Sequence, residues 1–280
     1  MNPAAADVPV TGYIDGIQHT VVIDAYQHRP VIGSYVAAGA GTGAGELAGL
    51  CERLTVWCSH DDAVQVADRF AGSGLTVVSL ACQDPATFSH VVAQAVSSLR
   101  SAAEVRLFRA LSAAAPDGLL VVDGAIADVH SHRNVVGVVK SFNTRYLSDE
   151  SCLWGLRPGW CSPVFSIDAS ARAHMSPNAE IAAGVAAALG DAAAPQVPSG
   201  DVQVLSCYVR AHSAASAGVG HGLVRVEALT GQLLEVAAAL VWQGRQDERS
   251  GDPRWDRHAA PIAETERLLR TRVPIVFSAH

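Results

Sequence analysis

Two apolar runs near the middle of the chain constrain the fold more than any other feature of the sequence. The first run, Leu119–Val122, is closed by Asp123 and Gly124, and the second, Val135–Val139, is closed by Lys140. Apolar runs without alternation are typical of strands buried on both faces, which occur in sheets covered by helices on both sides. The sequence therefore predicts an α/β protein with Asp123 at the end of a central strand.

Other segments supply further strands and helices for such a sheet. Short runs rich in β-branched residues predict strands at 13–16, 20–25, 31–36, 54–57, 75–80, 202–209 and 222–228. Helix-forming patterns predict helices at 61–70, 85–111, 178–189 and 263–272. Because only short turns separate the first three strands, we expect them to pair antiparallel.

The stretch 37–45 consists of alanine and glycine with one threonine. It contains neither the GxGxxG pattern nor the Gly-Lys-Ser/Thr sequence that hold nucleotide phosphates. We therefore interpret it as a flexible connection.

Composition bounds the number of domains. The 280 residues are 49% hydrophobic and 17% charged, which excludes a chain that stays disordered as a whole. Residues 170–200 are rich in alanine, proline, glycine and serine, as flexible or inserted segments often are. We expect one domain over residues 1–280, interrupted by this segment.

Charge and cysteine usage exclude several classes of protein. A net charge of −7 argues against a protein that coats nucleic acid by bulk charge, so any DNA contact must be local. The first residues lack the basic and apolar regions of a secretory signal, and no window is apolar enough to span a membrane, so we expect a cytoplasmic protein. The six cysteines form no CxxC pair, which argues against a zinc site and favours buried thiols.

Three acidic residues are candidates for a shared metal site. Asp15 and Asp123 each lie at the end of a predicted strand and precede a glycine, and Glu104 lies on the predicted helix that leads to Asp123. Carboxylates at the ends of neighbouring strands meet at one edge of a sheet, where their hard oxygens can hold Mg²⁺ or Mn²⁺. Two such ions would support phosphodiester cleavage. The alternative is that both Asp-Gly pairs are turns and Glu104 is a solvated helix residue.

The only lysine of the chain, Lys140, ends the second apolar run and is followed closely by Arg145. An ammonium group at this point could contact a scissile phosphate while the Arg145 guanidinium binds a neighbouring one. The alternative is that both side chains extend into solvent from the end of a strand.

Several segments, in order along the chain, resemble the NurA-type nucleases, which are partners of HerA-type hexameric DNA translocases. The most specific are Leu120–Gly124 and Val136–Leu147. The opening strands and the C-terminal half of the family are matched by shorter segments, at 13–17, 33–39, 208–210, 222–227, 252–254 and 266–270.

The resemblance implies an RNase H-like α/β fold, a mixed sheet flanked by helices and related to the Piwi nuclease domain. It also implies Mn²⁺- or Mg²⁺-dependent cleavage of DNA, with 5′-to-3′ exonuclease and single-strand endonuclease activity in the resection of DNA ends. Such nucleases act as homodimers docked on the ring of the HerA-type ATPase, in DNA repair or in defence against foreign DNA. Carried over by position, Asp15, Glu104 and Asp123 match the acidic metal ligands of the family.

A fourth site residue departs from the family pattern. Members often have a histidine on the last helix, preceded by a tyrosine-proline pair that this chain lacks. His258 is our first candidate for the fourth position, and Asp252 and His280 are weaker ones. The alternative is that His258 is an ordinary polar residue.

Two other functions stay open at this point. The missing tyrosine-proline pair and the acidic charge favour a catalytically inactive, nuclease-like adaptor subunit of a translocase complex. A metal-dependent phosphohydrolase of a small nucleotide would use the same acids, although it would not account for the length of the resemblance. DNA digestion with and without Mn²⁺ separates these functions.

Overall fold

A mixed sheet of nine strands organises the part of the chain that the computed structural model describes, residues 9–82, 84–126, 133–140, 146–147, 151–168, 203–211, 222–243 and 260–274. The strand order is β4-β3-β2-β1-β5-β6-β9-β8-β7. The strands are β1 (Val10–Tyr26), β2 (Arg29–Gly41), β3 (Leu47–Ser59), β4 (Thr76–Leu80), β5 (Leu119–Asp123), β6 (Val135–Val139), β7 (Phe165–Asp168), β8 (Gln203–Arg210) and β9 (Leu223–Ala228).

Helices flank this sheet, which confirms the predicted α/β class with a mixed sheet. They are a 3-10 turn at His60–Asp62 and the helices α1 (Ala63–Arg69), α2 (Pro85–Ala114), α3 (Ser151–Trp154), α6 (Gly231–Gln243) and α7 (Ala260–Arg270). The predicted helix at 178–189 and the segment 170–200 lie outside the described residues. No helix in the described ranges is long and apolar enough to cross a membrane.

The three N-terminal strands form an antiparallel meander. The strands predicted at 13–16 and 20–25 are one strand, β1, whose pairing with β2 is irregular only between Val22 and Asp24. The turn between β1 and β2 is formed by Gln27 and His28, both with positive φ (47° and 68°), as a two-residue hairpin requires. On its other edge β1 pairs in parallel with β5, and β5 pairs in parallel with β6.

The alanine- and glycine-rich stretch is not a flexible connection, because Ala37–Gly41 belongs to β2 and is buried. Small side chains are needed there, since helix α7 packs closely on β2. A Cβ on Gly39 would lie 2.8 Å from Leu269 Cδ2, and one on Gly41 would overlap Thr265 Oγ1. The connection to β3 is therefore only the short segment 42–46.

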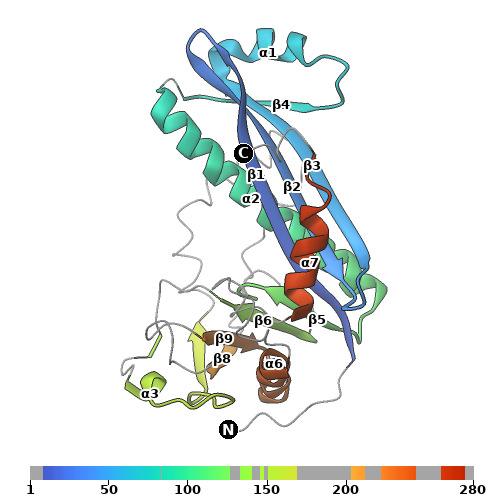
Figure 1. Ribbon diagram of the computed structural model, residues 1–280, viewed down its shortest axis with the longest axis vertical. Coiled ribbons are helices and arrows are strands. Elements are labelled where there is room, and N and C mark those ends of the chain that lie inside the picture. The colour runs from blue at the N-terminus through green and yellow to red at the C-terminus, as the bar shows by residue number, and fades with distance from the viewer. Residues whose placement is uncertain are drawn as a thin grey trace.

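Different helices cover the two faces of the sheet (Figure 1). Helix α2 packs on one face of β1, β2 and β3, and α7 lies across β1 and β2 on the other, with α6 beside it against β6, β8 and β9. Ile14 and Leu120 belong to the core under α2, whereas Tyr13 and Val121 belong to the core that includes α6 and Ile262 of α7. Because side chains alternate along a strand, Asp15 and Asp123 are on the α7 face.

Candidate functional site

Asp15 and Asp123 are neighbours on adjacent strands. The parallel register pairs Tyr13 with Val121 and Ile14 with Val122, which brings Asp15 next to Asp123. The interpretation of Asp15 as a residue that ends a strand is wrong, because β1 continues to Tyr26 along β2. The strand that ends here is β5, at Asp123. Beyond Asp15, β1 therefore has no β5 neighbour on this edge, and this end of β5 is called the opening below.

Lys140 lies just past the end of β6 and closes one side of this opening. Its Nζ is 2.5 Å from Asp123 Oδ2, and both side chains are largely buried, with 14% and 18% of their surface exposed. The lysine therefore lies next to Asp123 and pairs with it in this structure.

Glu104 approaches Asp123 and Lys140 from α2, on the opposite face of the sheet. It passes beside β1 at Gly16, where a Cβ would overlap Glu104 Oε1 and lie 2.9 Å from Arg100 Cγ. Arg100 Nη1 donates to Glu104 Oε1 (3.1 Å) and, at 3.4 Å, to the Gly16 carbonyl oxygen. The glycine after Asp15 thus makes room for an acid and its arginine.

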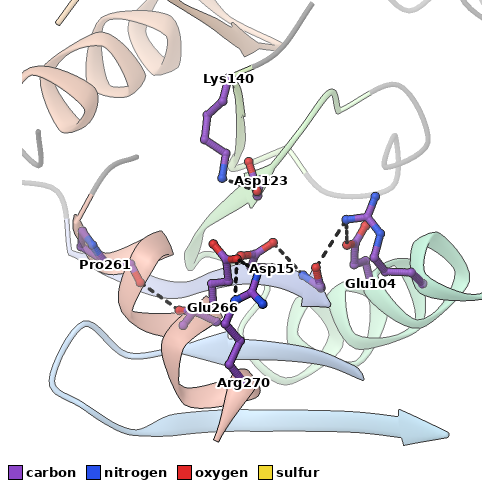
Figure 2. A network of polar contacts seen from close by, with 10 residues as sticks. Asp15, Glu104, Asp123, Lys140, Pro261, Glu266 and Arg270 are labelled. Carbon is purple, nitrogen blue, oxygen red and sulfur yellow. Dashed lines mark hydrogen bonds and ion pairs between the residues drawn. The ribbon is translucent and has the colours of Figure 1, made fainter. Parts of the chain in front are cut away.

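Sequence reasoning missed a fourth acid, Glu266 of α7. Figure 2 shows its side chain directed toward Asp15, while Asp123 and Glu104 approach from β5 and α2. Arg270, one turn later, donates from Nε (2.9 Å) and Nη2 (2.6 Å) to Glu266 Oε1. The helical spacing indicates that Glu266 faces inward, because it lies four residues after Ile262 and three before Leu269, which are both buried.

Burial and neighbouring acids raise the pKa values of Asp15 and Glu104. Burial raises the pKa of Asp15 well above its ordinary value, and the charges of Asp123 and Glu266 raise it further, against the opposing effects of Lys140 and the Gly16 N–H. Burial and Asp123 also raise the pKa of Glu104 to about 7, against the opposing charges of Arg100 and Lys140. A cluster in which carboxylates repel one another favours the binding of protons or of cations.

The acids do not already form a closed metal cage. Within the described ranges, no group of three His, Cys, Asp or Glu side chains is arranged to hold a metal ion. Asp123, Glu104 and Glu266 each pair instead with a cationic side chain, Lys140, Arg100 and Arg270 respectively. The donor set itself fits Mg²⁺ or Mn²⁺, because carboxylate oxygens are the ligands that these ions prefer.

The other predicted site residues lie outside the described residues. These are Arg145, His258, Asp252 and His280. The structure therefore brings together Asp15, Glu104, Asp123 and Lys140 of the predicted set and adds Glu266.

Comparison of the sequence with protein-family models gives no match, and comparison with curated protein sequences gives none either. The resemblance to NurA-type nucleases is carried only by the residues quoted above.

Proposed function

We propose that this protein is a metal-dependent deoxyribonuclease of the NurA type, built on an RNase H-like, Piwi-related fold. The observation that carries the proposal is the convergence of Asp15, Glu104, Asp123 and Glu266, from four separate elements, on one opening of the sheet. Burying several acids that face one another is costly, so such a cluster is explained best by a cationic ligand.

The acids hold the metal ions in this proposal. Asp15 and Asp123 are the principal ligands, Glu104 positions the second ion, and Glu266 takes the fourth position assigned above to His258. When bound, a pair of Mn²⁺ or Mg²⁺ ions supplies an activated water and stabilises the leaving oxygen of a phosphodiester. Arg100 and Arg270 keep Glu104 and Glu266 oriented.

Lys140 acts on the substrate side. Its ammonium pairs with Asp123 in this structure. Cation binding at Asp123 would replace this ion pair, and the lysine would then contact a DNA phosphate, with Arg145 on the next one.

Partners follow from the charge and the resemblance. We expect cleavage of linear ends from 5′ to 3′ and of single strands, by a cytoplasmic homodimer that works with a HerA-type ATPase in DNA end resection. A chain with a net charge of −7 binds DNA weakly by itself, so the ATPase supplies processivity.

The test is DNA digestion by Asp15→Asn and Asp123→Asn variants. We expect wild-type protein to degrade labelled linear DNA with Mn²⁺, and each variant to lose more than about 100-fold, beyond the loss typical of residues that only support a metal ligand. Asp61→Asn is the matched control, because Asp61 is half-exposed and pairs with Arg29 away from the site. Unchanged cleavage by either site variant would overturn the assignment.

One observation favours a second function, a catalytically inactive adaptor. The ion pairs of Asp123, Glu104 and Glu266 with cationic side chains satisfy these acids without metal. If the folded wild-type protein binds a HerA-type ATPase but shows no turnover with Mn²⁺ or Mg²⁺, the adaptor function holds. Hydrolysis of small nucleotides without DNA degradation would instead indicate the phosphohydrolase.

A further inference from the structure

A second polar site lies away from the acids, at the opposite end of the central strands. It is a hollow of about 560 Å³ between the last turns of α2 and the segments that lead into β5 and β6, lined by Arg109, Ser112, Asp117, Arg133 and Asn134 among others. Residues Leu119 and Asp123 at the two ends of β5 are about 13 Å apart at the usual rise of a strand. The hollow is therefore separate from the acid cluster.

Two arginines without partners distinguish this hollow. Most arginines in the described part of the chain pair with an acid, as Arg29, Arg69 and Arg272 do. Arg109 and Arg133 form no ion pair or hydrogen bond with another described residue, yet both line the same hollow. In a chain of net charge −7, two guanidinium groups that face one space without a carboxylate partner indicate an anion.

One residue in the wall of this hollow, Ser112, has a buried hydroxyl without a partner. Ser112 Oγ is inaccessible to solvent and has no hydrogen-bond partner, although a serine inside a helix usually donates to the carbonyl four residues earlier. On the rim, Asn134 Nδ2 donates to the Asp117 carbonyl oxygen (3.1 Å), which fixes the loop beside the hollow. The lining carries two positive charges and the one negative charge of Asp117.

We infer that this hollow binds a phosphate group, with Arg109 and Arg133 on its oxygens and Ser112, once its side chain rotates toward the hollow, as a neutral donor. Guanidinium groups bind phosphate through paired, charge-assisted hydrogen bonds, and a hydroxyl completes the donor set. The phosphate belongs to a free nucleotide or to a nucleic-acid backbone, which present the same chemistry. The inference does not depend on the proposed nuclease activity.

The experiment measures binding in EDTA, so that no cleavage takes place. Inorganic phosphate and thymidine monophosphate are titrated by calorimetry, and a labelled 20-nucleotide single strand by fluorescence anisotropy. The variants are the double variant Arg109→Gln/Arg133→Gln, Ser112→Ala and Asp117→Asn. The control is Arg69→Gln/Arg272→Gln, which removes the same charge from two exposed ion pairs.

We expect the Arg109/Arg133 double variant to lose about tenfold or more in affinity, as the loss of hydrogen bonds to a charged group predicts. The control should stay within about twofold, Ser112→Ala should weaken binding less than the double variant, and Asp117→Asn should strengthen it. For the single strand, the slope of log affinity against log salt should fall by about 0.7, the contribution of one neutralised phosphate.

The three probes separate the two sources of the phosphate. Tighter binding of the mononucleotide than of the single strand assigns a nucleotide site, and the reverse assigns a backbone site. If no probe binds, or if the double variant and the control lose affinity equally, the inference is wrong. Neither result affects the nuclease proposal, because no metal or cleavage enters the assay.

Discussion

Glu227 and Asp15 are acids buried in the same sheet, but their surroundings differ in kind. Glu227 on β9 is completely buried, and its two oxygens accept from Arg225 Nε (3.0 Å) and the Ile126 N–H (3.1 Å). Asp15 is 3% exposed and accepts from the Gly16 N–H (2.8 Å), but it faces the charges of Asp123 and Glu266. A satisfied acid of the first kind supports the fold, whereas an acid of the second kind is the type that we propose to bind a cation.

Removing the charge should therefore have opposite effects on stability at these two positions. Glu227→Gln removes the carboxylate charge beside the buried Arg225 guanidinium, and we expect it to lower the free energy of unfolding by about 3–5 kcal/mol. Asp15→Asn keeps an acceptor for the Gly16 N–H and removes the repulsion by Asp123 and Glu266, so we expect a gain in stability at pH 8. Urea unfolding in EDTA measures both. Changes of the same sign would contradict the comparison.

Glu104 should make stability depend on pH. Its pKa rises from 4.5 to about 7 on folding, so the folded state holds the proton more tightly and stability falls as pH rises through this range. The full loss is about 3 kcal/mol at 1.36 kcal/mol per pH unit. We expect Glu104→Gln to remove this slope in urea unfolding between pH 5 and 8 without metal. Parallel curves for the variant and the wild type would show that Glu104 titrates normally.

Two glycines of β1 should differ in their tolerance of a methyl group. A Cβ on Gly16 overlaps Glu104, whereas one on Gly12 meets its nearest atoms, Ala40 Cβ and Leu120 Cδ2, at an ordinary 3.6 Å. Overpacking costs about 1–3 kcal/mol, and displacement of Glu104 should also lower the Mn²⁺-dependent activity of Gly16→Ala. Gly12→Ala, the matched control, should change neither quantity by much. Equal effects at both positions would mean that Gly16 has no special role.

The smallest expected change in stability is that of Arg270→Gln. Its ion pair with Glu266 is half-exposed on the arginine side, and a pair of this kind contributes about 0.3–0.5 kcal/mol. Because Arg270 orients a proposed metal ligand, calorimetry should nevertheless show Mn²⁺ affinity lower by about 10-fold or more. Arg267→Gln on the same helix is the control, since its contact with Glu264 is long, at 4.0 Å. Equal Mn²⁺ affinities would remove Glu266 from the site.

Much of the fold could be predicted from local patterns. The uninterrupted apolar runs gave β5 and β6 almost to the residue, because a strand buried on both faces has few alternative structures. Asp123 at the end of β5 and Glu104 on α2 followed from these elements. The proximity of Asp15 to Asp123 was also predicted. The strand that carries Asp15 was predicted too short, because only the pairing with β2 shows that β1 continues.

Two features needed the third dimension. The buried end of β2 looks like a linker in the sequence, because alanine and glycine have low strand propensity and only the close approach of α7 explains them. Glu266 looks like half of a surface Glu–Arg pair, because that pair is typical of solvated helices. Its inward position depends on the packing of α7 over β1, which no local pattern contains.

The antiparallel pairing of β1 with β2 extends from the acid cluster to the turn of the hairpin. The turn at Gln27 and His28 lies at least about 36 Å beyond Asp15, at the usual rise of a strand. The register irregularity between Val22 and Asp24 lies between Asp15 and this turn, and irregularities of this kind bend a strand locally. The turn and the acid cluster are therefore well-separated positions on one hairpin, joined by paired strands that include this irregularity.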